Sequence, residues 1–279
     1  MKECRGEIFV INANTNPKEN FDPGILVTGI SIYEVLRVKE KTPLFLEDHI
    51  ERLFYSAKVS GAKTLPSLKL IRENFIMLIE NNPDIQEGNI RLLLHFENIV
   101  RQKPDIYCYY IPHSYPSEKE YVSGVPLILV NAERQKVHSK IINLEFRSFI
   151  AHRIKAKNAY EALLINREGL ITEGSKSNVF MIRKNKVVTP PEKDVLPGIT
   201  RKYVLRICKE SGINAEESKV HCKEISDYES CFITGTSPGV LAVRNIGSIW
   251  FNREHELLLK LSGQYQLLVD NYIALKTKV

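Results

Sequence analysis

The stretch Leu-Ile-Thr-Glu-Gly-Ser-Lys-Ser-Asn-Val-Phe, residues 170–180, decides how the rest of the chain is interpreted. It reads as a polar turn of small residues between two strand-like runs, 160–166 and 178–183. The turn carries one acid, Glu173, followed by a glycine and by serine and asparagine side chains. Such a turn either exposes its carboxylate to water or holds it rigidly in a cavity, and the other motifs of the chain distinguish the two.

The composition is that of a globular protein. The chain has 279 residues, of which 43% are apolar and 26% are charged, and this length is sufficient for two domains. No apolar run reaches the roughly 18 residues of a membrane span, and the first residues contain no apolar signal core. We therefore expect a cytoplasmic protein that does not bind membranes.

The charged residues, the cysteines and the histidines exclude several kinds of site. The net charge is +6, but basic and acidic residues are mixed along the chain, so no nucleic-acid patch is predicted. The five cysteines form no C-x-x-C pair, which is typical of free thiols in a reducing compartment. The seven histidines are scattered, and no metal site is expected.

The apolar patterns predict a mixed α/β fold with two domains. A smaller N-terminal domain, residues 1–111, combines strands at 7–12, 30–38, 43–46, 89–96 and 105–111 with helices at 47–61 and 67–82 and a loop at 14–24. The polar segment 112–121 contains two prolines and is the best linker candidate. The larger C-terminal domain, 122–279, has strands at 125–130, 160–166, 178–188, 230–234 and 240–243 and helices at 200–211 and 254–276. A further helix after Lys140 is expected to bury Ile142, Phe146, Phe149, Ile150 and Ile154.

Three segments have the chemistry of anion binding. Leu196-Pro-Gly-Ile-Thr-Arg places Thr200 at a helix start, where N–H groups and the helix dipole favour a phosphate; simple capping by Thr200 is the alternative. The segment Gly235-Thr-Ser supplies hydroxyl and backbone donors, or is only a turn. Arg52 lies off the apolar stripe of its helix and either pairs with Asp48 or binds phosphate bidentately.

Lys140 completes this set of side chains. It stands between a strand region and a helix, in His-Ser-Lys-Ile-Ile-Asn. A lysine there is usually solvated, but lysine is also the side chain that forms a Schiff base with an aldehyde cofactor. One carboxylate, one lysine and three anion-binding segments together indicate a phosphorylated aldehyde with a basic ring nitrogen, which describes pyridoxal 5'-phosphate.

The order of these motifs resembles the class IV aminotransferases. This fold-type IV group of pyridoxal-phosphate-dependent enzymes includes branched-chain aminotransferases, D-amino acid aminotransferases and 4-amino-4-deoxychorismate lyases. The matching pieces cover most of the chain: Ile-Tyr-Glu-Val-Leu-Arg-Val (32–38), Leu-Glu-Asp-His-Ile-Glu-Arg-Leu with Ser-Ala (46–57), Lys-Ile-Ile-Asn (140–143), Tyr-Glu-Ala-Leu-Leu (160–164), Thr-Glu-Gly-Ser-Lys-Ser-Asn-Val-Phe (172–180), Leu-Pro-Gly-Ile-Thr-Arg (196–201) and Thr-Gly-Thr-Ser (234–237).

The resemblance implies a role for each matching residue. Lys140 would hold the cofactor as an aldimine and carry a proton between substrate and cofactor, with Lys155 and Lys157 as weaker candidates. Glu173 would face the ring nitrogen and keep it protonated. The implied cofactor-binding set is Arg52, Lys140, Glu173, Ser177, Asn178, Ile199, Thr200, Thr236 and Ser237. Tyr33 matches a substrate-pocket tyrosine of the D-amino acid enzymes, and Arg91 matches an arginine on the substrate side of the branched-chain enzymes.

The resemblance also implies an activity. It is amino transfer between an amino acid, branched-chain-like or D-configured, and a 2-oxo acid, in a homodimer. Glu34 follows Tyr33 as in the transaminases, whereas the lyases commonly have threonine there, so transfer is favoured over the lyase reaction, which releases pyruvate and 4-aminobenzoate. A non-catalytic relative is disfavoured because Lys140 and Glu173 are both present. The segments around Thr28 and His95 depart from the family's pattern and leave the substrate-carboxylate contact unassigned.

Overall fold

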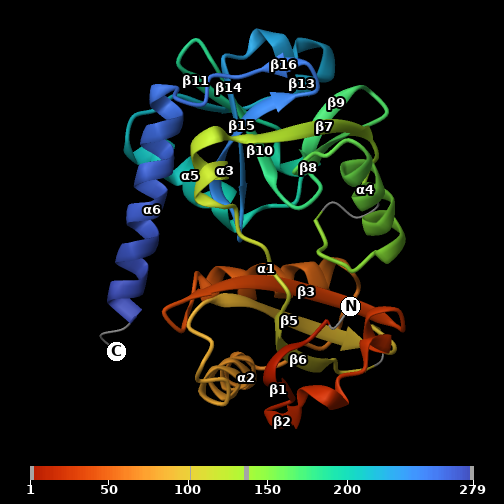
Figure 1. Cartoon of the computed structure of the whole chain (residues 1–279). Coiled ribbons are helices and arrows are strands. Elements are labelled where there is room, and N and C mark those ends of the chain that lie inside the picture. Colours follow the sequence, from red (N-terminus) through yellow and green to blue (C-terminus); the bar gives the residue numbers. More distant parts are fainter. Residues whose placement is uncertain (1–2, 101, 135–137, 277–279) are drawn as a thin grey trace. The chain divides into compact units, whose positions relative to one another are not determined.

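A computed structural model describes residues 3–100, 102–134 and 138–276 (Figure 1). The chain forms two compact units, each with its own sheet. Unit 1 comprises Met1–Ser114, His138–Ile142 and Asn271–Val279, and unit 2 comprises Tyr115–Val137 and Asn143–Asp270. The mixed α/β fold is therefore confirmed. The short segment that carries Lys140 belongs to unit 1, although the residues on either side of it in sequence belong to unit 2.

The sheet of unit 1 has six strands in the order β2-β1-β6-β5-β3-β4. Its strands β3, β5 and β6 pair antiparallel over most of their lengths. Helices α1 and α2 cover one face of this sheet (Figure 1), where their apolar sides pack against Ile32, Leu36 and Leu92. The elements are β1 (Arg5–Ile11), β2 (Asn14–Pro17), η1 (Lys18–Asn20), η2 (Pro23–Leu26), β3 (Ile30–Lys39), β4 (Thr42–Pro43), α1 (Leu46–Val59), α2 (Leu68–Glu80), β5 (Gly88–Phe96) and β6 (Asp105–Ile111).

Two local predictions in unit 1 are corrected. The segment 14–24 is not a plain loop, because Asn12 and Ala13, with φ of 49° and 60°, turn the chain back so that β2 pairs with β1. The strand expected at 43–46 shrinks to Thr42–Pro43, since α1 already begins at Leu46. The N-cap expected at Ser67 is confirmed, because its side chain accepts a hydrogen bond from the Leu70 N–H.

The sheet of unit 2 has ten strands, with the order β12-β11-β10-β14-β15-β7-β8-β9-β13 and β16 paired to β15. Strand β7 is parallel to both of its neighbours, β15 and β8. The elements are α3 (Glu118–Ser123), β7 (Val125–Asn131), α4 (Leu144–Ala156), β8 (Glu161–Ile165), β9 (Leu170–Gly174), β10 (Asn178–Arg183), β11 (Lys186–Thr189), η3 (Glu192–Asp194), α5 (Ile199–Glu210), β12 (Ala215–Glu217), β13 (Val220–His221), η4 (Cys222–Asp227), β14 (Ser230–Gly235), β15 (Gly239–Ile246), β16 (Ile249–Trp250) and α6 (Glu256–Lys276).

Three expectations in unit 2 need correction. Glu173 lies in a strand, β9, which pairs antiparallel with β8, so the turn is confined to residues 175–177. The buried face predicted for α4 is right only in part: Ile150 is buried and Phe146 and Ile154 pack partly buried against the same cluster, but Phe149 is 43% exposed and Ile142 precedes the helix. The segment 112–121 includes the start of helix α3, which Ser117 and Glu120 begin with a capping box.

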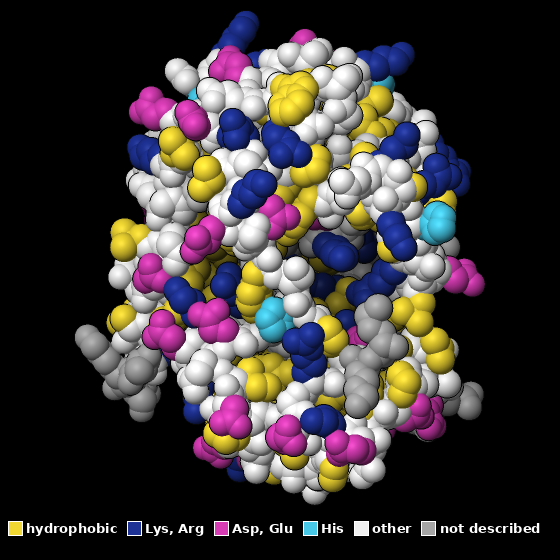
Figure 2. All heavy atoms as spheres, in the orientation of Figure 1, with side chains coloured by type: hydrophobic (Ala, Val, Ile, Leu, Met, Phe, Trp, Pro, Cys, Tyr) yellow, Lys and Arg dark blue, Asp and Glu magenta, His cyan; other side chains and the backbone are white. Residues whose placement is uncertain are grey.

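The surface agrees with the mixed charge of the sequence. Lys and Arg side chains are interspersed with Asp and Glu side chains over the face drawn in Figure 2. Among the described residues, no helix is both long enough and apolar enough to cross a membrane.

Candidate active site

Lys140 is fixed to strand β3, along the part of that strand that β4 leaves uncovered. The Tyr33 N–H donates to the Lys140 carbonyl at 3.0 Å, and the Ile142 N–H donates to the Ser31 carbonyl at 3.2 Å. Tyr33 and Glu34 are successive residues of β3, so their side chains point to opposite faces of the sheet, and Lys140 lies beside both. Lys140 Nζ lies 3.7 Å from Glu34 Oε2 and 5.5 Å from the centroid of the Tyr33 ring.

Glu34 is the centre of a buried ionic cluster under helix α1. Its carboxylate is fully buried and accepts two hydrogen bonds from Arg52, from Nε at 2.8 Å and from Nη2 at 2.6 Å. Since a carboxylate only accepts, His49 donates its Nδ1–H to Glu34 Oε2, at 2.8 Å. Lys140, at 3.7 Å, is the most distant of the three partners. The four side chains form one network in unit 1.

The protonation states within this network follow from burial and charge. Burial opposes ionisation of Glu34, but the Arg52 guanidinium and then the Lys140 ammonium outweigh it and hold the pKa of Glu34 well below its usual range. Burial lowers the pKa of His49 more than the neighbouring carboxylate raises it. At neutral pH, Glu34 is therefore ionised and His49 is neutral.

Glu173 is held at both carboxylate oxygens within unit 2. It is 3% exposed; Arg134 Nε donates to its Oε1 at 2.6 Å, and the Leu196 N–H donates to its Oε2 at 3.1 Å. A buried carboxylate that accepts a hydrogen bond from a cation also has the chemistry to accept one from a protonated ring nitrogen. Glu173 therefore fits the protonated ring nitrogen of pyridoxal phosphate.

The start of α5 is tied to the same part of unit 2. Asn178 Nδ2 donates to the Leu196 carbonyl at 2.9 Å, and Asn178 pairs with Thr234 across β10 and β14. The first N–H groups of a helix have no intrahelical acceptor. The N-cap of α5 is Gly198, which has no side chain that could accept from them. Ile199 and Thr200 are buried in that first turn.

A phosphate group fits this arrangement. Thr234 Oγ1 is buried and, within the described part of the chain, has no hydrogen-bond partner. Thr236 and Ser237 lie directly beyond it, in the connection from β14 to β15. Helix N–H groups and hydroxyls are the donors that phosphate prefers in proteins.

The predicted site residues thus fall into two groups. Tyr33, Arg52, Arg91 and Lys140 lie in unit 1, where Glu34 joins Arg52 to Lys140 and the Tyr33 ring lies near both Lys140 and Arg91. The remaining predicted residues lie in unit 2, around the turn 175–177 and the start of α5: Glu173, Ser177, Asn178, Ile199, Thr200, Thr236 and Ser237.

Four side chains of the candidate site were not predicted from the sequence: Glu34, His49, Glu161 and Arg134. Glu34 served only to separate transaminases from lyases, and His49 was given no role. Glu161 is buried, and its carboxylate accepts from the Lys176 N–H at 2.5 Å and from Ser175 Oγ at 3.3 Å, which holds the turn after Glu173. A charge inside an apolar strand is the signal that marks both Glu34 and Glu161. Arg134 follows strand β7 in irregular structure, and its sequence context carries no such signal.

A glycine keeps this turn compact, which gives a stability prediction. A Cβ added to Gly174 would lie 2.2 Å from Ser177 Oγ and 2.6 Å from Glu161 Oε1. We expect Gly174→Ala to lower the free energy of unfolding by about 1–3 kcal/mol, because the turn must shift. The control is Gly263→Ala in α6, where nothing lies within 4 Å of the added Cβ and alanine favours the helix by about 0.5–1 kcal/mol. Urea denaturation measures both, and an unchanged midpoint for Gly174→Ala would contradict the packing described here.

Comparison with known proteins identifies relatives of the chain. The family model for amino-transferase class IV matches residues 31–246. The D-alanine aminotransferase of Bacillus licheniformis is 32% identical over 227 residues, which are 78% of this chain and 79% of that protein. A putative branched-chain-amino-acid aminotransferase of Methanocaldococcus jannaschii is 28% identical over 261 residues, 88% of this chain and 89% of that protein.

A solved structure shares the fold. The branched-chain amino acid aminotransferase of the organism abbreviated T.th., determined with pyridoxamine 5'-phosphate, superimposes with a TM-score of 0.84 at 23% identity, over 97% of this chain and 96% of that chain. The fold, the buried acid and the lysine thus occur together with a family match over most of the sequence. The chain belongs to the class IV aminotransferase family. It is an enzyme of that pyridoxal-phosphate-dependent family, as the resemblance implied.

Proposed function

We propose that this enzyme transfers an amino group from an amino acid to a 2-oxo acid, with Lys140 as the residue that moves the proton. The observation that carries the proposal is the placement of Lys140 beside a buried carboxylate whose stronger contacts are already made by Arg52 and His49. When bound, pyridoxal phosphate supplies a reactive aldehyde and an electron-accepting ring. The protein supplies binding, orientation and proton transfer.

The proton is proposed to move on Lys140 Nζ. As a neutral amine, Lys140 Nζ would take a proton from the substrate Cα and become an ammonium, and it would then give that proton to the bound cofactor, which is general acid–base catalysis. Glu34 attracts the Lys140 side chain only weakly. Its negative charge is neutralised first by Arg52, and its contact with Lys140 is the longest in the cluster. The Tyr33 ring, 5.5 Å away, faces the ammonium and restricts the positions open to it.

The remaining residues are proposed to hold the cofactor and the substrate. Glu173 keeps a proton on the ring nitrogen, while Ser177 and Asn178 shape the turn that presents it. The phosphate is bound by the main chain of Ile199 and by the hydroxyls of Thr200, Thr236 and Ser237. Arg52 contributes positive charge while Glu34 holds its Nε and Nη2. Tyr33 and Arg91 lie on the substrate side.

Support for the substrate class comes from the relatives. The match to a D-alanine aminotransferase and the match to a putative branched-chain enzyme favour a donor with a small or branched apolar side chain. We also propose a cytoplasmic homodimer; the five unpaired cysteines agree with a reducing compartment, and light scattering of the eluted holoenzyme measures the assembly.

A product assay tests the activity. The holoenzyme is incubated with L- and D-amino acids, each with pyruvate or 2-oxoglutarate, and separately with aminodeoxychorismate, and chiral chromatography identifies the products. The expected result is a new amino acid in equal amount to the 2-oxo acid derived from the donor. If aminodeoxychorismate gives free 4-aminobenzoate and pyruvate, and no donor gives amino transfer, the proposed activity is wrong and the enzyme is the lyase.

A further inference from the structure

Serine hydroxyls join the segment 138–142 to the C-terminal end of helix α1. Ser139 Oγ lies 2.9 Å from Oγ of Ser60, the C-cap of α1, and 3.3 Å from the Ser56 carbonyl oxygen. Ser56 Oγ in turn donates to the His138 carbonyl at 3.4 Å. All of these residues belong to unit 1. The contacts therefore attach the segment to the helix directly before the lysine of the site.

The direction of these hydrogen bonds follows from the number of protons. A serine hydroxyl donates one hydrogen bond, and a carbonyl oxygen only accepts. Ser139 therefore donates to the Ser56 carbonyl, and Ser60 donates to Ser139. We call these two hydrogen bonds the serine link. Replacement of Ser139 breaks both of them, whereas replacement of Ser60 breaks one.

Burial makes the serine link a firm attachment. Ser139 is 8% exposed and Ser56 is fully buried, so water does not readily replace a lost partner of either residue. A buried hydroxyl without a partner is destabilising. The segment 138–142 therefore cannot move along α1 without a loss of free energy.

Strand β3 holds the other end of the same segment. The Tyr33 N–H donates to the Lys140 carbonyl at 3.0 Å, and the Ile142 N–H donates to the Ser31 carbonyl at 3.2 Å. Lys140 is thus attached on both sides, to α1 through Ser139 and to β3 through its own carbonyl and the residues that follow.

This attachment bears on the distance between the Lys140 amine and Glu34. Lys140 Nζ lies 3.7 Å from Glu34 Oε2, whereas a close ammonium–carboxylate hydrogen bond measures about 2.7–2.9 Å. A lysine side chain is flexible, so the position of its main chain decides how near the amine comes to the carboxylate. An ammonium drawn onto the carboxylate holds its proton more tightly, and its amine is then a poorer base.

We propose that Ser60 and Ser139 are positioning residues for the proton transfer assigned to Lys140. The proposal rests on the proposed function, since it concerns the same amine. The serine link holds the segment 138–142 against α1, and this keeps the amine out of close contact with Glu34 and available to the substrate. Both serines act through Lys140.

Hydrogen exchange of the holoenzyme, followed by mass spectrometry, tests the attachment without turnover. We expect Ser60→Ala to speed exchange at the amides of Ile141 and Ile142 about fivefold, the factor that corresponds to one net hydrogen bond. Ser139→Ala should speed it further, because both hydrogen bonds are lost. Exchange elsewhere in unit 1 should not change, which separates a local effect from a general loss of stability.

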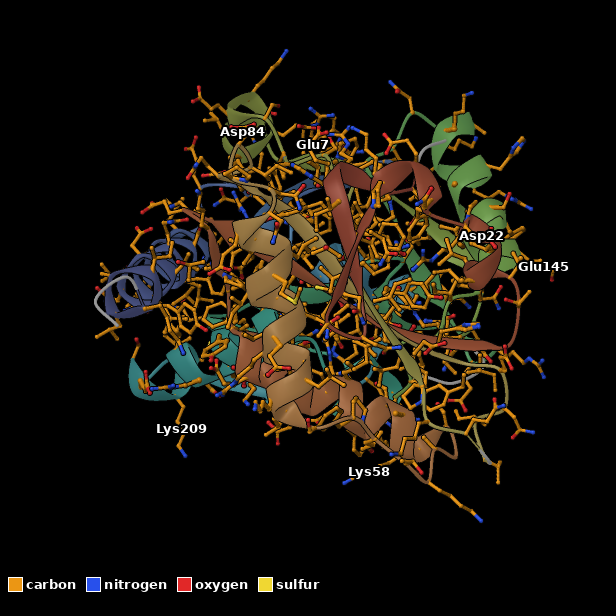
Figure 3. The ribbon with its side chains drawn as sticks, turned by 90° about the horizontal axis from the view of Figure 1, so that it is seen from below. Glu7, Asp22, Lys58, Asp84, Glu145 and Lys209 are labelled. Carbon is orange, nitrogen blue, oxygen red and sulfur yellow. The ribbon has the colours of Figure 1, made fainter. Side chains whose placement is uncertain are left out.

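Lys58→Ala is the matched control. Lys58 (Figure 3) lies in the last turn of the same helix and is exposed. Its removal should change neither the exchange of the segment 138–142 nor the kinetics described below.

Steady-state kinetics test the effect on proton transfer. The donor is D-alanine or L-valine, whichever the product assay identifies, with deuterium at Cα. We expect Ser139→Ala to lower kcat about tenfold, less than the roughly hundredfold that a 1 Å misplacement can cost, with both KM values unchanged. The isotope effect on kcat should rise, because proton transfer becomes the slow step. Ser60→Thr keeps the hydroxyl and should behave as the wild type, whereas Ser60→Val, of the same shape, should behave as Ser60→Ala.

Three outcomes would overturn the proposal: unchanged exchange of the segment in Ser139→Ala, a lower kcat without a larger isotope effect, or a further loss of kcat when Ser60→Ala is added to Ser139→Ala. The last would show that the two serines act independently. If the wild-type enzyme transfers no amino group while Ser139→Ala still speeds exchange at Ile141 and Ile142, the proposed function fails and the attachment of Lys140 stands.

Discussion

Lys140→Ala is expected to lower the amino-transfer rate of this enzyme by at least about a thousandfold, because the variant loses the group proposed to move the proton. The same variant should lose the visible absorption of the lysine-bound cofactor while still binding the cofactor's phosphate, since the phosphate donors proposed for unit 2 are untouched. Stopped-flow kinetics and absorption spectra of the purified protein measure the two effects.

Lys157→Ala is the control for this experiment. Lys157 is the C-cap of α4 and is exposed, and with Lys155 it is one of the two weaker candidates for the role of Lys140. Its replacement should change neither the spectrum nor the rate. A normal cofactor spectrum in Lys140→Ala, or its loss in Lys157→Ala, would remove Lys140 from its proposed role.

Glu34→Gln is expected to lower both stability and activity. The substitution keeps the shape of the side chain but leaves the buried Arg52 guanidinium without its counter-ion, and breaking a buried ion pair costs about 3–5 kcal/mol of unfolding free energy. The comparison is Glu47→Gln, which disrupts an ion pair with Lys276 in the same unit. Because both members of that pair are about half exposed, the change should stay below about 1 kcal/mol. Thermal unfolding that shifts equally for both variants would contradict the network.

The pH dependence of stability provides a second measurement on Glu34. Its pKa is lower in the folded than in the unfolded chain, so the unfolded chain takes up the proton first as the pH falls. The contribution of Glu34 is therefore fully present at neutral pH and is lost below about pH 4, the ordinary range of a glutamate. We expect the wild-type protein to lose stability steeply there. In Glu34→Gln the loss should be smaller, and equal slopes for the two proteins would show that Glu34 does not titrate as described.

The local sequence pattern was enough to predict most helices and strands and to identify the family. Alternating apolar residues in β3 and the 3.6-residue period in α1 and α2 reflect one buried face each, and that face is visible in the sequence. Motif order identified the family because short segments such as 172–180 and 196–201 combine unusual polar residues at fixed separations. The buried face of α4 was predicted correctly at Ile150 but not at Phe149, which is exposed in this structure.

The ion-pair partners of the charged residues could be found only in the folded chain. Glu34 and Arg52 are 18 residues apart, Arg134 and Glu173 are 39 apart, and Glu3 and Arg91 are 88 apart. Strand pairing and the return of residues 138–142 to unit 1 bring such groups together, and no local period encodes those distances. From the sequence, Lys140 and Glu173 could be proposed as site residues because the chemistry restricts the residue type. Which charge neutralises which was determined by tertiary contacts, because in a buried site the nearest counter-ion, rather than the nearest residue in sequence, sets the energy.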